Sequence, residues 1–128
     1  MLIGIIGYGV VGRAAEATFS RKYDILKYDK FGKYDSFKSL INCDFVLVTV
    51  PTPFDYQKNK SDDTAVIESL EKLESLSYSG IVMIKSTLVP GSCKNYNSLF
   101  DLKIVQLQIQ FLILLFLFLA ILQIYLFV

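Results

Sequence analysis

The chain has 128 residues, which is enough for one domain with one core and leaves no room for a separate substrate domain. Thirteen Lys and Arg residues against twelve Asp and Glu residues give a net charge of +1, so the chain lacks the basic footprint of a nucleic-acid-binding protein. The absence of histidine argues against a metal site. Two distant cysteines, Cys43 and Cys93, without a secretory signal favour a cytoplasmic protein with free thiols.

The first hundred residues alternate between strand and helix patterns. The apolar run over 2–6 is typical of a strand buried on both faces, and a glycine-rich turn separates it from the next helix. Alternation of this kind predicts an α/β fold: a Rossmann-type parallel sheet of four to five strands with helices on both faces. We expect strands over 2–6, 23–28, 44–50, 80–85 and, beginning a fifth, 102–105, and helices over 13–19, 36–41 and 64–76, the last capped by Asp62 or Asp63.

The turn after the first strand reads Gly7-Tyr8-Gly9-Val10-Val11-Gly12, the G-x-G-x-x-G pattern of dinucleotide-binding folds. In that pattern the first glycine allows a tight turn, the second lets a pyrophosphate approach the backbone, and the third permits close packing of helix on strand. Free N–H groups at the helix N-terminus favour the bound anion. Asp29, 22 residues after Gly7, stands where the pattern places the acid that binds the adenosine ribose. The sequence therefore predicts a dinucleotide site.

The acid favours NAD over NADP, because a carboxylate repels a 2′-phosphate. The neighbouring Lys30 and Lys33 weaken this preference without reversing it. Two alternatives stay open at this point: glycines that serve only the turn, and a similar fold that binds FAD or S-adenosylmethionine. The first is less favoured, because the motif follows a strand, opens a helix and has its acid at the expected distance.

Two further strand ends narrow the family. Val50-Pro51-Thr52-Pro53 follows the third strand, and Lys85-Ser86-Thr87-Leu88-Val89-Pro90-Gly91 follows the fourth. Together with the glycine motif, these segments resemble the NAD-binding half of the UDP-glucose/GDP-mannose dehydrogenase family over about residues 1–103. The resemblance implies oxidation of the 6-hydroxyl of a nucleotide sugar to a carboxylate with two NAD molecules, by a catalytic cysteine and lysine on later segments.

The resemblance also implies the residues that contact the cofactor. Thr52 and Thr87 belong at the carboxyl ends of neighbouring strands, where ligands of open α/β sheets lie. Thr87 is also a candidate for arranging the reacting hydroxyl, although no residue of this chain is assigned as catalytic. The implied cofactor contacts are Gly7, Tyr8, Gly9, Val10, Val11, Gly12, Asp29, Lys33, Val50, Pro51, Thr52, Ser86 and Thr87.

The sequence departs from the family after about Val105. The family's Asn-Pro-Glu-Phe segment and the later glycine-rich segment with the catalytic cysteine are missing, and Cys43 and Cys93 do not occupy the nucleophile's position. A small buried thiol is the expected role for each. We therefore expect cofactor machinery without sugar oxidation by this chain alone, and a nucleotide-sugar partner only with the missing domain.

No charged residue follows Lys103, and the segment over 106–128 is almost wholly apolar. We expect an NAD-binding domain over 1–105 and an apolar tail over 106–128. The tail is long enough for a transmembrane anchor that would hold the domain at a membrane, on its cytoplasmic side. A reading-frame shift in an AT-rich gene is the favoured explanation, because the resemblance stops in mid-strand.

The leading functional hypothesis is the NAD-binding portion of a nucleotide-sugar 6-dehydrogenase of UDP-glucose or UDP-N-acetyl-sugar type. One alternative is a non-catalytic NAD-binding module tethered to a membrane. Another is the Rossmann half of a different NAD-dependent dehydrogenase, which the two strand-end motifs disfavour. The oligomeric state is not predicted.

Overall fold

A computed structural model describes residues 1–107 of the chain, and all structural statements below concern this part. The elements alternate between strands and helices, as the sequence pattern predicts. In chain order they are β1 (Leu2–Ile6), α1 (Val10–Phe19), β2 (Asp24–Tyr28), the 3₁₀ helix η1 (Phe37–Asn42), β3 (Phe45–Val48), β4 (Phe54–Asp55), β5 (Lys60–Ser61), α2 (Thr64–Ser75), β6 (Ile81–Ile84), α3 (Ser92–Leu99) and β7 (Lys103–Gln106).

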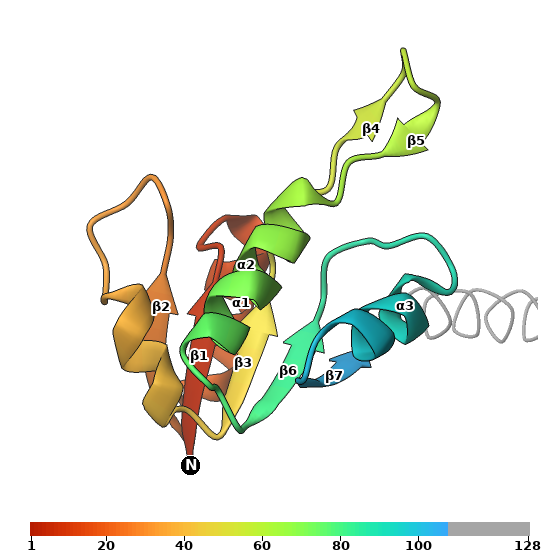
Figure 1. Cartoon of the computed structure of the whole chain (residues 1–128). Helices are drawn as coiled ribbons and strands as arrows, with labels where there is room; N and C mark the ends of the chain where they lie inside the picture. Colours follow the sequence, from red (N-terminus) through yellow and green to blue (C-terminus); the bar gives the residue numbers. More distant parts are fainter. Residues whose placement is uncertain (108–128) are drawn as a thin grey trace, which may run out of the picture.

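Five strands form one parallel sheet in the order β2-β1-β3-β6-β7 (Figure 1). β1 pairs with β2 on one side, where Ile6 faces Tyr28, and with β3 on the other, where Ile6 faces Val48. The chain leaves β1 towards β2 but leaves β3 towards β6, so the strand order reverses between β1 and β3. Ligands of open α/β sheets bind at such a switch point, beyond the carboxyl ends of the strands.

Each face of the sheet has its own apolar core. On one face Ala15 of α1 packs with Ile3, Ile5 and Leu47. The larger core on the other face joins strand residues to Leu40 of η1, to Val66, Leu70 and Leu73 of α2, and to Tyr96 of α3. Accordingly, α2 crosses the front of the sheet in Figure 1 and α1 lies behind it. The prediction of a parallel sheet with helices on both faces is confirmed.

The predicted start of one helix needs correction, and the predicted cap of another is settled. α1 begins at Val10 rather than Arg13, because Gly9 takes the N-cap position and the last part of the glycine motif is already helical. α2 begins at Thr64 with Asp63 as N-cap, yet the Asp63 side chain accepts no capping bond. Asp62 instead accepts a hydrogen bond from the Thr64 backbone N–H at 3.0 Å.

The sequence did not predict two elements. The Lys-, Asp- and Asn-rich loop contains the antiparallel hairpin β4–β5, which stands away from the sheet at the top of Figure 1. α3 follows Gly91, whose φ of +93° places it in the left-handed region. The sequence of α3 is mostly polar, but Tyr96 anchors it in the larger core with 4% of its surface exposed.

The predicted apolar tail, with its alternatives of anchor and frameshift product, falls almost entirely outside the described residues. Gln106 ends β7, and Leu107 donates its backbone N–H to Ile84 at 3.0 Å. Up to that point, no helix combines the length and the apolar character that crossing a membrane requires.

Candidate functional site

The glycine turn between β1 and α1 has the geometry that the motif predicts. Gly7 has a φ of +89°, and a Cβ there would lie 2.9 Å from backbone atoms of Thr49 and Val50. A Cβ at Gly12 would overlap the carbonyl oxygen of Gly7, so this glycine lets α1 sit directly on the turn. A Cβ at Gly9, in contrast, would meet no atom within 4 Å. Two glycines therefore serve packing, and the third opens space above the helix N-terminus.

The N-terminus of α1 carries free backbone donors. The first N–H groups of any helix lack an intrahelical acceptor. Gly9 has no side chain to cover the backbone N–H groups of Val10, Val11 and Gly12. The first N–H group of α1 with an intrahelical acceptor is that of Arg13, which donates to the Gly9 carbonyl at 3.0 Å. These donors, the helix dipole and the open space at Gly9 together suit an anionic group such as a pyrophosphate.

Asp29 lies directly after β2, beside the glycine turn. Its Oδ2 accepts the backbone N–H of Tyr8 at 2.7 Å, and its Oδ1 accepts the N–H of Phe31 at 2.9 Å. A second link joins the same segments, since the Gly7 N–H donates to the carbonyl of Tyr28 at 2.9 Å. The carboxylate is thus fixed in orientation, and each oxygen keeps a lone pair for a ligand hydroxyl.

A pocket of about 470 Å³ lies at the switch point, between these strand ends and α2. The glycine turn and the Asp29 loop form one side, and Thr49, Val50 and Pro51 form the floor after β3. Gly7, Gly9, Asp29, Val50 and Pro51 are therefore the sequence-predicted site residues that line the pocket.

Further lining of the pocket comes from α2 and η1, which sequence reasoning did not assign to the site. Thr64, Ala65, Glu68, Ser69 and Lys72 face the pocket from α2, and Phe37 faces it from η1. Their spacing on α2 was a signal for a second, polar stripe beside the apolar one, because positions 64/65, 68/69 and 72 recur at helical intervals. Tyr28, Lys30 and Phe31 also line the pocket.

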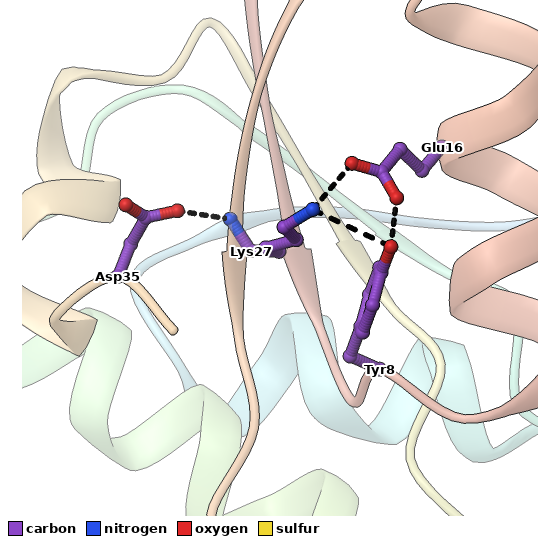
Figure 2. A network of polar contacts seen from close by, with 4 residues as sticks. All are labelled: Tyr8, Glu16, Lys27 and Asp35. Carbon is purple, nitrogen blue, oxygen red and sulfur yellow. Dashed lines mark hydrogen bonds and ion pairs between the residues drawn. The ribbon is translucent and has the colours of Figure 1, made fainter. Parts of the chain in front are cut away.

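A polar network holds the outer side of the glycine turn (Figure 2). The Tyr8 hydroxyl donates to a carboxylate oxygen of Glu16 on α1. Lys27 of β2 pairs with the other Glu16 oxygen at 2.6 Å, and its Nζ lies 4.8 Å from the centre of the Tyr8 ring. Asp35 accepts the Lys27 backbone N–H at 2.8 Å. Tyr8 thus joins the turn to α1 and β2 but does not line the pocket.

The ends of β3 and β6 meet as the two strand-end motifs predict. The Thr52 hydroxyl donates to the backbone carbonyl of Thr87 at 2.8 Å, and the Ser86 hydroxyl donates to the carbonyl of Val50 at 2.6 Å. Thr87 is exposed. These contacts put Thr52, Ser86 and Thr87 at one corner of the sheet edge, next to Val50 of the pocket wall.

Besides Tyr8, Gly12 and the corner residues Thr52, Ser86 and Thr87, three more sequence-predicted residues are not part of the pocket lining: Val10, Val11 and Lys33. Val10 and Val11 are exposed at 78% and 43%, and their side chains lie on the surface beside the free N–H groups. Lys33 is exposed on the loop after β2, and Lys30 of the same loop reaches the pocket instead. The Lys30 Nζ lies 3.4 Å from Glu68, which gives its charge a partner.

Neither cysteine lies at the pocket. Cys43 is 4% exposed, and burial, followed by the charges of Asp44 and Asp35, raises its pKa to about 11. Burial also raises the pKa of Cys93 in α3, whose Sγ lies 3.8 Å from the carbonyl of Ile104. Cys43 is a small core thiol, as the sequence predicts, whereas Cys93 is only half-buried against the larger core. In the part that the structure covers, no group of three or more His, Cys, Asp or Glu side chains is arranged to hold a metal ion.

The sequence over residues 27–114 matches the NAD binding domain of the UDP-glucose/GDP-mannose dehydrogenase family. The chain belongs to this family. Its cofactor is NAD, and the glycine turn, Asp29 and the adjoining pocket fit that cofactor. No curated protein sequence matches significantly.

Solved structures of other proteins share the fold. A GDP-mannose dehydrogenase from Pseudomonas aeruginosa superposes with a TM-score of 0.62 at 18% identity, covering 74% of this chain and 30% of that one. An NDP-N-acetyl-D-galactosaminuronic acid dehydrogenase from Methanosarcina mazei gives 0.61 at 18%, covering 73% and 29%. The capsular polysaccharide assembling protein CapF from Staphylococcus aureus gives 0.55 at 17%, covering 84% and 30%. The matched region thus spans less than a third of each of these chains.

Proposed function

We propose that this chain is the NAD-binding portion of a nucleotide-sugar 6-dehydrogenase of UDP-glucose or UDP-N-acetyl-sugar type. Such an enzyme oxidises the 6-hydroxyl of the sugar to a carboxylate with two NAD molecules. The observation that carries the proposal is the pocket at the switch point, bordered by the open glycine turn and the oriented Asp29 carboxylate. The family membership supports it independently.

Each group at the pocket has a role in the proposal. The N–H groups of Val10, Val11 and Gly12 bind the pyrophosphate. Gly7 and Gly9 shape the turn, and the Tyr8 side chain anchors it to α1 and β2. Asp29 accepts the hydroxyls of the adenosine ribose, and Lys33 is proposed to approach that ribose from the exposed loop after β2. Val50 and Pro51 form the wall along the dinucleotide. Thr52, Ser86 and Thr87 contact the nicotinamide ribose.

NAD supplies the hydride acceptor for the oxidation. The residues of this chain orient it: the helix N-terminus fixes the pyrophosphate, and the corner at Thr52 and Thr87 fixes the far end. Since Thr87 is exposed beside that corner, its hydroxyl is our candidate for arranging the reacting sugar hydroxyl. The nucleotide sugar itself is proposed to bind with segments outside the described residues.

Substitution of Asp29 tests whether the cofactor is NAD. We expect Asp29→Asn to lower NAD affinity roughly tenfold, because hydrogen bonds from the ribose to a charged acceptor are lost. NADP should lose less or gain, since the 2′-phosphate no longer meets a negative charge. Titration calorimetry with both dinucleotides gives the ratio of affinities, which does not depend on any shared loss from the disturbed turn. An unchanged NAD/NADP ratio would contradict the role of Asp29. Asp24→Asn, at the other end of β2, is the matched control.

We also expect the purified chain to produce no NADH from UDP-glucose and NAD. A thiol nucleophile must reach the substrate and ionise, but both cysteines lie away from the pocket with raised pKa values. The measurement is NADH absorbance over hours at saturating NAD. Turnover that scales with protein concentration and disappears in Cys43→Ala or Cys93→Ala would refute this expectation.

A further inference from the structure

The pocket extends well past the groups that bind the pyrophosphate and ribose. The glycine turn and Asp29 occupy one side of it. Next to Asp29 the lining includes Tyr28 and Phe37, whose rings lie edge to face with centroids 4.9 Å apart, and Ala65 of α2 also lines the pocket. Such a partly apolar slot suits a flat heterocycle. With the ribose on Asp29, the base of the dinucleotide has this end of the pocket to occupy.

Glu68 is the acceptor at this end. Its side chain is 45% exposed and lines the pocket, and the Lys30 ammonium lies 3.4 Å from its carboxylate. The other polar side chains of α2 that line the pocket have partners. The Thr64 hydroxyl donates to Asp62 at 2.5 Å, the Ser69 hydroxyl donates to the Ala65 carbonyl at 2.7 Å, and the Lys72 ammonium lies 5.7 Å from the centre of the Phe37 ring. The Lys30 contact is long and lies at the surface, so it costs little to exchange for another donor.

We propose that Glu68 is a specificity-determining residue that reads the base of the dinucleotide by accepting a hydrogen bond from the 6-amino group of adenine. This inference rests on the proposed function, because it takes the ribose to lie on Asp29. Adenine presents a donor at this position, whereas hypoxanthine and guanine present a carbonyl oxygen. A carboxylate accepts from the former and repels the latter, so a single side chain discriminates between the bases.

The test compares NAD with nicotinamide hypoxanthine dinucleotide, whose base carries a 6-carbonyl in place of the 6-amino group and a hydrogen on the adjacent N1. We expect the unmodified chain to bind NAD roughly tenfold more tightly in titration calorimetry. Glu68→Ala should bring the ratio of the two affinities close to one. Glu68→Gln should also bring it close to one but keep the NAD affinity higher than Glu68→Ala, because a rotated amide can donate or accept.

Two matched variants separate base reading from the ion pair and from general charge. Lys30→Met removes the partner of Glu68 but leaves the carboxylate, so the preference for NAD should persist. Glu71→Ala removes an exposed carboxylate of the same helix that does not line the pocket, and it should change nothing. Each ratio is measured within one variant, so a modest loss of stability affects both ligands alike.

Equal binding of the two dinucleotides by the unmodified chain would overturn the role of Glu68 while leaving the proposed function intact. The same holds if Glu68→Ala keeps the full preference for NAD. Failure of both dinucleotides to bind would overturn the proposed function and, with it, the reading of the base.

Discussion

Alanine at Gly9 is expected to remove most NAD binding without disturbing the fold. A Cβ at this position meets no protein atom within 4 Å, so the unfolding transition should stay where it is. The methyl group instead projects into the space above the N-terminus of α1, where the pyrophosphate must approach the N–H groups. Losing two hydrogen bonds to a charged group costs about 3 kcal/mol, or roughly a hundredfold in affinity. Titration calorimetry measures the loss of NAD affinity, and thermal unfolding of the same sample checks that the stability is unchanged.

Gly12→Ala is the matched comparison within the same motif. Here the added Cβ overlaps the Gly7 carbonyl oxygen, so α1 must move off the turn, and overpacking of this kind costs about 1–3 kcal/mol. This variant should lose stability and NAD affinity together, whereas Gly9→Ala loses affinity alone. If Gly9→Ala binds NAD as tightly as the unmodified chain, the pyrophosphate does not lie over this helix N-terminus.

The glycine turn and Asp29 could be predicted from the sequence because each has a local structural requirement. The turn is a local structure. Its glycine positions are set by backbone sterics and by the close packing of helix on strand, and the position of Asp29 is set by the length of one βαβ unit. Parallel strands also end at the same edge, so a motif after β3 and another after β6 must meet. The hydrogen bond from Thr52 to the Thr87 carbonyl confirms that reasoning.

The sequence did not predict that α2 lines the pocket, and the reason is physical. Helical periodicity identifies the apolar stripe at Val66, Leu70 and Leu73, which packs in the core. It says nothing about which neighbouring stripe faces a ligand, because that depends on where α2 crosses the sheet. Glu68 therefore looks like any surface carboxylate until the crossing is known. α3 was missed because a single tyrosine, rather than an apolar stripe, anchors it.

The larger core also contains two acidic groups whose titration should weaken the fold at high pH. Burial raises the pKa of Cys43 from 9.0 to about 11, with smaller contributions from Asp44 and Asp35. Burial likewise raises the pKa of Tyr78, whose hydroxyl donates to the Cys43 carbonyl at 3.0 Å and which is 3% exposed. Both groups hold their protons more tightly in the folded chain than in the unfolded one.

Stability should therefore be complete below pH 9 and fall as the pH rises towards 11, because the unfolded chain releases these protons first. For Cys43 the loss amounts to about 2–3 kcal/mol, and Tyr78 adds to it. Urea unfolding followed by circular dichroism at pH 8 and pH 11 measures this loss. Cys43→Ala leaves a small cavity, so this variant should be less stable at both pH values. The difference between its free energies of unfolding at pH 8 and pH 11 should nevertheless be smaller than in the unmodified chain. Tyr78→Phe should shrink it as well, whereas Tyr56→Phe, at a phenol that is 87% exposed, should not. If the Cys43→Ala and Tyr78→Phe variants lose as much stability between pH 8 and pH 11 as the unmodified chain, alkaline unfolding begins elsewhere in the molecule.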